Sequence, residues 1–333
     1  MADRPLSPTS FLDFIQRFST VDACIEFLAS SRWPDGFRCP RCRGSDAWQL
    51  RSRPLWECSG CGKQTSVTAG TVLHKTRTDL RIWLYALWVF GVRHTSISAL
   101  QLQRETGLRR YETAWTILHK VRAVLSESPD YKLSRGVVEV DESSWGGGGR
   151  NKGRRLDPLA SWLLVAVERI EMTKGIGEEA IHYQASGSAR LVVAKDCSKD
   201  TLLEFIRASI SPGATIATDG WGGYHRLVEA GFVHNPRKCG GLPAVTDEHL
   251  PKVHLLISNL KTWLRGTFHG VSDKHLLVYA REFIYRFNRR HLRDRQELFG
   301  YVVRRVVRNA PTTMRELIHG QLKEQPPPVA TVG

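Results

Sequence analysis

The sequence lacks any apolar run long enough to cross a lipid bilayer. Its longest run, Ile82–Val92, has 11 residues between two arginines, whereas a membrane-spanning helix needs about 20. The N-terminus carries Asp3 and Asp13 and no continuous apolar stretch, so we expect no secretory signal peptide. These absences predict a cytoplasmic protein without a membrane partner. An apolar content of 41% excludes global disorder.

Acidic residues and cysteines are also scarce. The 33 Asp and Glu residues face 48 Lys and Arg residues, which gives a formal net charge of +15. This positive excess favours a polyanionic partner, and nucleic acid first. An odd total of seven cysteines, without a secretion signal, argues against a disulfide framework. Four of the seven lie within residues 39–61, so we expect a local cluster in a reducing compartment.

This cluster consists of two CxxC pairs separated by 15 residues: Cys39 with Cys42, and Cys58 with Cys61. Four thiolates complete a tetrahedral zinc shell and leave no position for a substrate. We therefore predict a structural zinc ribbon over residues 34–75, packed by Trp48 and Trp56. A redox-active CxxC pair and an iron–sulfur cluster are the alternatives.

Helical patterns flank the ribbon on both sides. Residues 1–33 read as a short N-terminal helical lead-in, and residues 76–130 as further helices. Within 76–130, one short helix ends near Gly107 and a second follows, which is typical of a helix-turn-helix. Arg109 and Arg110 stand where the second helix begins, so we expect them to contact DNA. An ordinary helical hairpin is the alternative.

Carboxylates end two β-rich runs in the second half of the chain. Val137–Glu142 and Ala214–Asp219 are both predicted strands, and further strands are expected at 161–167 and 191–194, with a helix at 199–210. Burying a carboxylate is costly unless it is hydrogen-bonded, paired or metal-bound. We therefore predict that Asp141 and Asp219 converge on a divalent metal. Taken singly, either acid could be a cap or turn residue.

A well-delimited helix follows over residues 251–266, with Pro251 in its first turn and Gly266 at its end. His254, Ser258 and Lys261 share one face of this helix. His254 could bind a metal or act as a base, and Lys261 could bind a phosphate. A solvated polar stripe is the alternative.

Basic side chains concentrate in two further places. A glycine-rich loop and the arginine-rich helices of Lys274–Arg308 are both predicted to contact the DNA backbone, through Arg150, Lys152, Arg154 and Arg155 in the loop and Arg289 and Arg290 in the helices. A buried stripe should run from Phe299 to Val307.

Residues 311–333 contain three consecutive prolines and few apolar side chains, so we expect a disordered tail.

In combination, these residues resemble the DDE triad of transposases. Asp141, Asp219 and His254 occupy the triad positions, with 35 positions from Asp219 to His254. The four-cysteine ribbon, the segment TDGWGGY and the run HLLISNLKTWLRGTFHGVSDKHLLVYAREFIYRFNRR narrow the resemblance. Over roughly residues 20–300 the chain resembles the zinc-ribbon DDE-type transposases of bacterial insertion sequences (the IS1595 superfamily, with an ISXO2-like domain).

The resemblance implies an α/β, RNase H-like (retroviral-integrase-like) catalytic domain, here over residues 131–310. It implies hydrolysis at the element end followed by strand transfer, with Mg²⁺ or Mn²⁺ held by Asp141, Asp219 and His254. Most DDE enzymes have Glu at the third position, and this superfamily has Glu, Asn or His there. Imidazole suits Mn²⁺ better than Mg²⁺. Asn259 is the second candidate for the third ligand.

The partners implied are double-stranded DNA, as element ends and target, and further copies of this chain in a homo-oligomer. Association with the nucleoid and no small-molecule cofactor are expected. Two other functions fit the same residues: a non-catalytic DNA-binding regulator with an inert sheet domain, and an RNase H-like nuclease that cuts particular DNA structures without joining strands.

Overall fold

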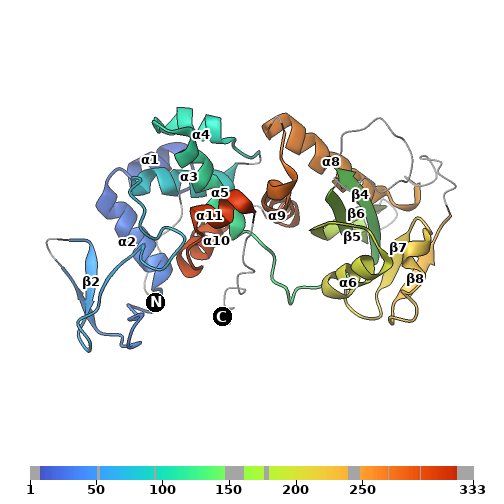
Figure 1. The fold of residues 1–333 in the computed structure, drawn as a ribbon, viewed down its shortest axis with the longest axis horizontal. Coiled ribbons are helices and arrows are strands. Elements are labelled where there is room, and N and C mark those ends of the chain that lie inside the picture. Colours follow the sequence, from blue (N-terminus) through green and yellow to red (C-terminus); the bar gives the residue numbers. More distant parts are fainter. Residues whose placement is uncertain are drawn as a thin grey trace. The chain divides into compact units, whose positions relative to one another are not determined.

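The computed structural model describes residues 8–320, except 51–52, 94, 147–160, 176–179, 239–247, 269 and 293. The chain divides into two compact units: unit 1 comprises Met1–Leu125 and Leu292–Gly333, and unit 2 comprises Ser126–His291. Figure 1 shows the elements in sequence colours. None of the helices in the described ranges has the length and apolar content needed to cross a membrane.

Unit 1 begins with two helices and a small sheet. Helices α1 (Phe11–Arg17) and α2 (Val21–Arg32) start where the hydroxyls of Ser10 and Thr20 accept backbone N–H groups. The strands β1 (Ala47–Gln49), β2 (Leu55–Cys58) and β3 (Gln64–Ser66) then form an antiparallel sheet in that order.

The other helices of unit 1 are α3 (Leu80–Val92), α4 (Ala99–Thr106), α5 (Tyr111–Ala123), α10 (Arg295–Arg308) and α11 (Met314–His319). Helix α10 lies against α3 so closely that a Cβ on Gly91 would come within 2.6 Å of the Phe299 Cα atom. The predicted stripe on α10 is buried, from Phe299 to Val307. The expected catalytic range, 131–310, therefore extends past unit 2, because this apolar stripe packs α10 into unit 1.

The expectation of a disordered tail over 311–333 is wrong for its first part. Thr313 and Glu316 cap α11 reciprocally, since each side chain accepts the other residue's backbone N–H. Leu317 is buried on this helix. Two caps and one buried side chain suffice for a single short helix, although the composition of the segment is polar. Residues 321–333 lie outside the described residues.

Unit 2 is built on one five-stranded sheet. Its order is β6 (Ile181–Ala194), β5 (Ser161–Lys174), β4 (Val137–Trp145), β7 (Thr215–Thr218) and β8 (Val233–Pro236). Strands β4, β5 and β6 are antiparallel neighbours, whereas β7 and β8 run parallel to β4. All four predicted strands are present, but three are longer than predicted, at 137–145, 161–174 and 181–194. The first does not end in its acids, because it stays paired with β5 through Asp141 to Trp145. Strand β8 was missed because Val233-His-Asn-Pro is short, polar and mostly exposed.

Helices cover both faces of this sheet. On one face lies α6 (Lys199–Ser209), which contacts β5 and β6; its Leu202 and Ile206 share one buried cluster with Val138 and Val140 of β4. On the other face lie α8 (Pro251–Phe268) and α9 (Asp273–Asn288), which contact β4, β5 and β6.

The predicted end of α8 at Gly266 is wrong, because the helix continues to Phe268. The Phe268 ring packs against Trp263 and Tyr279, with centroids 4.9 and 4.5 Å away. These aromatic contacts stabilise the last turn beyond the glycine.

Candidate functional site

The sheet places the two predicted aspartates on and directly after neighbouring strands: Asp141 lies in the middle of β4, and Asp219 is the first residue after β7. Side chains alternate along β4, and Val138 and Val140 face α6, so Glu139 and Asp141 face α8. Strand β7 pairs in parallel with β4, with Glu139 opposite Ala217. Strand β7 ends at Thr218, so Asp219 follows it directly, whereas Asp141 lies within β4 and is paired with Val165 of β5.

Polar side chains of helix α8 face β4 at Asp141 and Ser143. The His254 Nε2 atom lies 3.1 Å from Asp141 Oδ2, and the two side chains are 25% and 19% exposed. Two turns further on, Lys261 Nζ donates to Ser143 Oγ at 2.6 Å. Burial lowers the pKa of Lys261, as does the nearby Arg265, while Asp141 acts in the opposite direction. His254 and Lys261 therefore both face the part of β4 that carries Asp141 and Ser143.

Asp219 begins a tight turn after β7. Its Oδ1 accepts the Trp221 N–H at 2.9 Å, and Gly220 adopts a left-handed φ of 75°. At Gly223, a Cβ would lie 2.3 Å from the Trp221 ring, so the turn has no space for a side chain there. Asp219 makes no hydrogen bond to Asp141 or His254 among the described residues. The structure thus pairs Asp141 with His254 and places Asp219 directly after the adjacent strand. It does not gather the ligand atoms of these three residues into a cluster as tight as that of the cysteines described below.

A third acid near this site, Glu142, was not among the predicted residues. Its Oε2 accepts the hydroxyl of Tyr224 at 2.6 Å. Burial raises the pKa of Glu142 to about 7, the Tyr224 hydrogen bond opposes this, and the charges of Asp141 and Asp219 raise it further. The charges of Asp141 and Asp219 therefore both act on Glu142. The signal in the sequence was a second acid directly after Asp141, with a tyrosine in the TDGWGGY segment.

A fourth acid, Glu139, positions α8 and was also missed. Its side chain is fully buried and accepts the backbone N–H groups of Lys252 and Val253 at 2.7 and 2.9 Å. Arg169 pairs with Glu139 at 3.0 Å and also donates to the His249 carbonyl. Burial raises the pKa of Glu139, and these hydrogen bonds and charges oppose the shift. Glu139 thus fixes the start of α8 on β4, one residue before His254.

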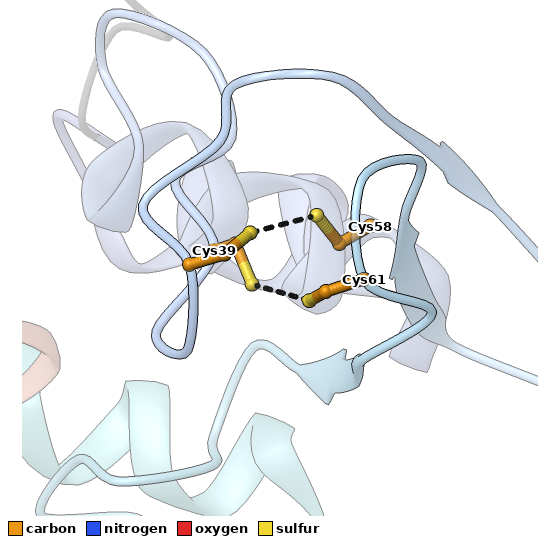
Figure 2. A group of neighbouring side chains, drawn as sticks. Cys39, Cys58 and Cys61 are labelled. Carbon is orange, nitrogen blue, oxygen red and sulfur yellow. Dashed lines mark hydrogen bonds between the residues drawn. The ribbon is translucent and has the colours of Figure 1, made fainter.

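In unit 1 the four predicted cysteines form a single cluster (Figure 2). Their Sγ atoms all lie within 4.8 Å of one another, with Cys39–Cys61 at 3.6 Å and Cys42–Cys58 at 3.5 Å. A tetrahedron with Zn–S bonds of about 2.3 Å has edges of about 3.8 Å, so these positions fit zinc. Within the described part of the chain, no other three His, Cys, Asp or Glu side chains bring ligand atoms this close.

Local backbone geometry assembles this cluster. The residue after each CxxC pair, Arg43 and Gly62, adopts a left-handed φ of 63° or 64°. The backbone amide of Cys42 is the main cause that lowers the pKa of Cys39, to about 6, which favours the metal-binding thiolate.

Packing around the ribbon differs in part from the prediction. Trp56 packs beside the cluster, as expected, with its ring 5.1 Å from that of Trp33. The prediction for Trp48 is wrong, since that residue is 50% exposed. Trp33, the residue that caps the C-terminus of α2, supplies the second aromatic ring beside the cysteines, because the chain passes from this helix directly into the ribbon.

Two helices joined by a short turn stand where the helix-turn-helix is predicted. Helix α4 ends at Gly107, whose φ of 69° allows the chain to turn, and α5 starts after Arg110. Arg109 and Arg110 are exposed at that start.

Asn259 is exposed on α8, about 140° around the helix from His254. Four predicted DNA-contacting residues lie outside the described residues: Arg150, Lys152, Arg154 and Arg155.

Two further predicted DNA contacts are engaged inside unit 2. Arg289 pairs with Glu127 at 2.5 Å and lies over the Tyr285 ring. Arg290 donates to the carbonyls of Ser186 and Gly187 on β6. Because both guanidinium groups already connect α9 to its neighbours, we leave Arg289 and Arg290 out of the DNA-binding set proposed below.

Comparison with known proteins gives matches to two domain families. Residues 133–288 match the family described as the ISXO2-like transposase domain, and residues 19–64 match the transposase zinc-ribbon domain. An uncharacterized protein in transposable element ISH50 of Halobacterium salinarum is 25% identical over 283 residues, which cover 81% of this chain and 91% of that protein. No solved structure matches the chain. The chain thus carries a region matching the transposase zinc-ribbon domain followed by a region matching the ISXO2-like transposase domain.

Proposed function

We propose that this chain binds the DNA ends of an insertion sequence and cleaves and joins phosphodiester bonds there. The observation that carries the proposal is the pairing of Asp141 with His254, whose Nε2 atom lies 3.1 Å from the carboxylate, beside a parallel strand that leads directly into Asp219. The match of residues 133–288 to a transposase domain supports the same reading.

The fold that we propose for unit 2 is RNase H-like. Three antiparallel strands, two parallel strands added beside β4, and helices on both faces support it. In this arrangement Asp141 lies in the central strand β4, and Asp219 directly follows β7, the strand that pairs in parallel with β4.

The donor set fits divalent cations. Asp141 and Asp219 offer carboxylate oxygens and His254 an imidazole nitrogen, a set that suits Mn²⁺ and also Mg²⁺. Glu142 is not part of this donor set: by the alternation along β4 it lies on the α6 side, where its Oε2 accepts the Tyr224 hydroxyl, although the charges of both aspartates act on it. When bound, such ions supply activation of the attacking oxygen and stabilisation of the leaving oxygen.

The chain's own residues then have distinct tasks. Asp141 orients the His254 ring through their contact, and Glu139 holds the helix that carries this ring. Lys261, oriented by Ser143, offers a point charge to a DNA phosphate beside the carboxylates. In unit 1, Arg109 and Arg110 at the start of α5 are placed to contact base edges in the major groove.

The partner proposed for these surfaces is double-stranded DNA, both as element end and as target. Two ends must be cut for one element to move, so we propose that the chain acts as a homo-oligomer. The loop residues Arg150, Lys152, Arg154 and Arg155 remain proposed phosphate contacts on the strength of their charge and their place after β4.

Cleavage of end-bearing DNA with Mg²⁺ or Mn²⁺ tests this function. We expect Asp141→Asn and Asp219→Asn each to lower the cleavage rate at least about 100-fold, a loss of about 2.7 kcal/mol of transition-state stabilisation. The control is Asp200→Asn on α6, a surface acid whose side chain is 87% exposed. Its rate should not change.

The rival functions give different outcomes in the same assay. Tight binding of end DNA by the unmodified chain without cleavage would support the non-catalytic regulator. Cleavage without any strand joining, when a 3′-hydroxyl end and target DNA are supplied, would support the nuclease.

A further inference from the structure

A basic groove in unit 1, separate from the carboxylates, has no role so far. It has a volume of about 340 Å³ and lies between the loop of residues 74–78, which leads into α3, and one side of α5. Its lining includes four cations and one acid, together with His74: Lys75, Arg77, Arg110, Lys120 and Glu112. A groove with this balance has a positive potential and favours an anionic ligand.

The cations of this groove are available for a ligand. Lys75, Arg77 and Arg110 are exposed, and these three side chains and Lys120 form no hydrogen bond or ion pair in the part of the chain that the structure describes. Other arginines of unit 1 are paired: Arg81 with Asp79 at 2.5 Å, and Arg93 with Glu105 at 3.2 Å. The groove is therefore a concentration of uncompensated positive charge.

The loop that carries two of these cations is held in one conformation. Trp83 Nε1 donates to Thr76 Oγ1 at 2.8 Å, and the Gly70 amide donates to His74 Nδ1 at 3.0 Å. Between them, Lys75 adopts a left-handed φ of 56°. That conformation costs a residue with a side chain about 1 kcal/mol or more, and such strain is found where function requires it. A rigid loop binds an anion without losing conformational entropy.

The groove adjoins the helix expected to read DNA. Arg110 precedes the first residue of α5, and Lys120 lies ten residues along it, or about 15 Å. The cations of the groove are thus spread along one side of α5, so they can meet more than one phosphate of a DNA strand. The major groove of B-form DNA admits a helix, whereas the major groove of duplex RNA is too narrow.

We propose that residues 74–78 and the adjoining side of α5 form a binding site for the phosphate backbone of duplex DNA, beside the segment that α5 contacts. This inference rests on the proposed DNA-binding function and adds a clamp that is independent of base sequence. Contacts to phosphates fix the position of a reading helix and carry no sequence information themselves.

The test measures DNA binding by the full, zinc-loaded chain over a series of salt concentrations. The variant is Lys75→Gln/Arg77→Gln, and the matched control is Lys199→Gln/Arg207→Gln, which removes two exposed cations from α6 of unit 2. Two short duplexes serve as probes, one from the element end and one of scrambled sequence. Zinc content and circular dichroism confirm that each variant is folded.

We expect the slope of log K against log salt to become shallower by about 2 in the groove variant, because each phosphate contact contributes about 0.9. Affinity should fall by the same factor for both duplexes, and the control should keep the slope of the unmodified chain. Lys120→Gln should reduce the slope by about 1.

An unchanged slope in the groove variant would overturn the proposal, as would a loss confined to the element-end duplex. A loss of affinity for duplex RNA with none for duplex DNA would assign the groove to a different partner and overturn it too. If the unmodified chain binds and cleaves end DNA while the groove variant keeps its slope, only this inference fails. If the unmodified chain binds no duplex DNA, the proposed function fails with it.

Discussion

The cysteine cluster of unit 1 and the carboxylate site of unit 2 are assembled in opposite ways. The four cysteines lie within 23 residues of sequence, and their sulfur atoms are within 4.8 Å of one another. Asp141, Asp219 and His254 are spread over more than 100 residues of sequence. Strand pairing and the hydrogen bonds that hold the start of α8 on β4 bring them toward one another. The first site is local, whereas the second depends on the whole of unit 2.

This difference predicts different consequences of metal binding. In a closed set of four thiolates with few other contacts, the metal contributes directly to folding. In unit 2 the sheet and its two helical layers form a core without the metal, and Asp141 already has His254 as a partner. We therefore expect zinc to stabilise the ribbon, and Mg²⁺ or Mn²⁺ to affect the reaction far more than stability.

The largest effect is expected from loss of a zinc ligand. Cys58→Ser should reduce bound zinc from one ion per chain to none and unfold β1–β3, because zinc binding in such sites is worth about 10–16 kcal/mol. Metal analysis and hydrogen exchange of the ribbon amides measure this. The control, Cys197→Ser, changes a buried cysteine of unit 2 and should retain zinc. Retention of zinc by Cys58→Ser would refute a ribbon that folds around its metal.

A smaller but still large effect is expected at Glu139. Glu139→Ala leaves Arg169 without its partner in the interior and should destabilise unit 2 by about 3 kcal/mol, measured by denaturant unfolding. The milder Glu139→Gln should lower DNA cleavage more than stability, since it weakens the contact that seats α8 and His254.

The matched control for Glu139 is Glu168. It is equally buried, and it accepts backbone N–H groups of Ser134, Arg135 and Ser188 without contacting α8. Glu168→Gln should cost similar stability and leave the cleavage rate of the folded protein unchanged. Equal loss of activity in both glutamine variants would show that Glu139 has no specific positioning role.

The smallest effects separate two tryptophans of the ribbon. Trp56→Ala removes a ring packed beside the cysteines and should destabilise the ribbon by about 2 kcal/mol, whereas the half-exposed Trp48 should tolerate alanine within about 0.5 kcal/mol. Zinc-chelator competition reports both. An equal response would contradict the packing that distinguishes these two rings.

The two sites also differ in how far the sequence predicts them. CxxC spacing predicts the cysteine cluster because its geometry is local, and the α4–Gly107–α5 turn is predictable for the same reason. The strand that carries Asp141 is predictable from its apolar run, but its continuation to Trp145 is not, since it depends on pairing with β5. The roles of Glu139 and Arg289 are not, since they depend on partners 114 and 162 residues away. Net charge likewise does not distinguish the paired Arg289 from the unpaired Lys75.

Binding of Mn²⁺ to the zinc-loaded full chain, followed by electron paramagnetic resonance, tests the central claim most directly. The account predicts that the unmodified chain and Glu168→Gln bind Mn²⁺, and that Asp141→Asn and Asp219→Asn lose this binding while keeping their zinc. Binding of Mn²⁺ to Asp219→Asn as tight as to the unmodified chain would contradict a shared site for the two aspartates.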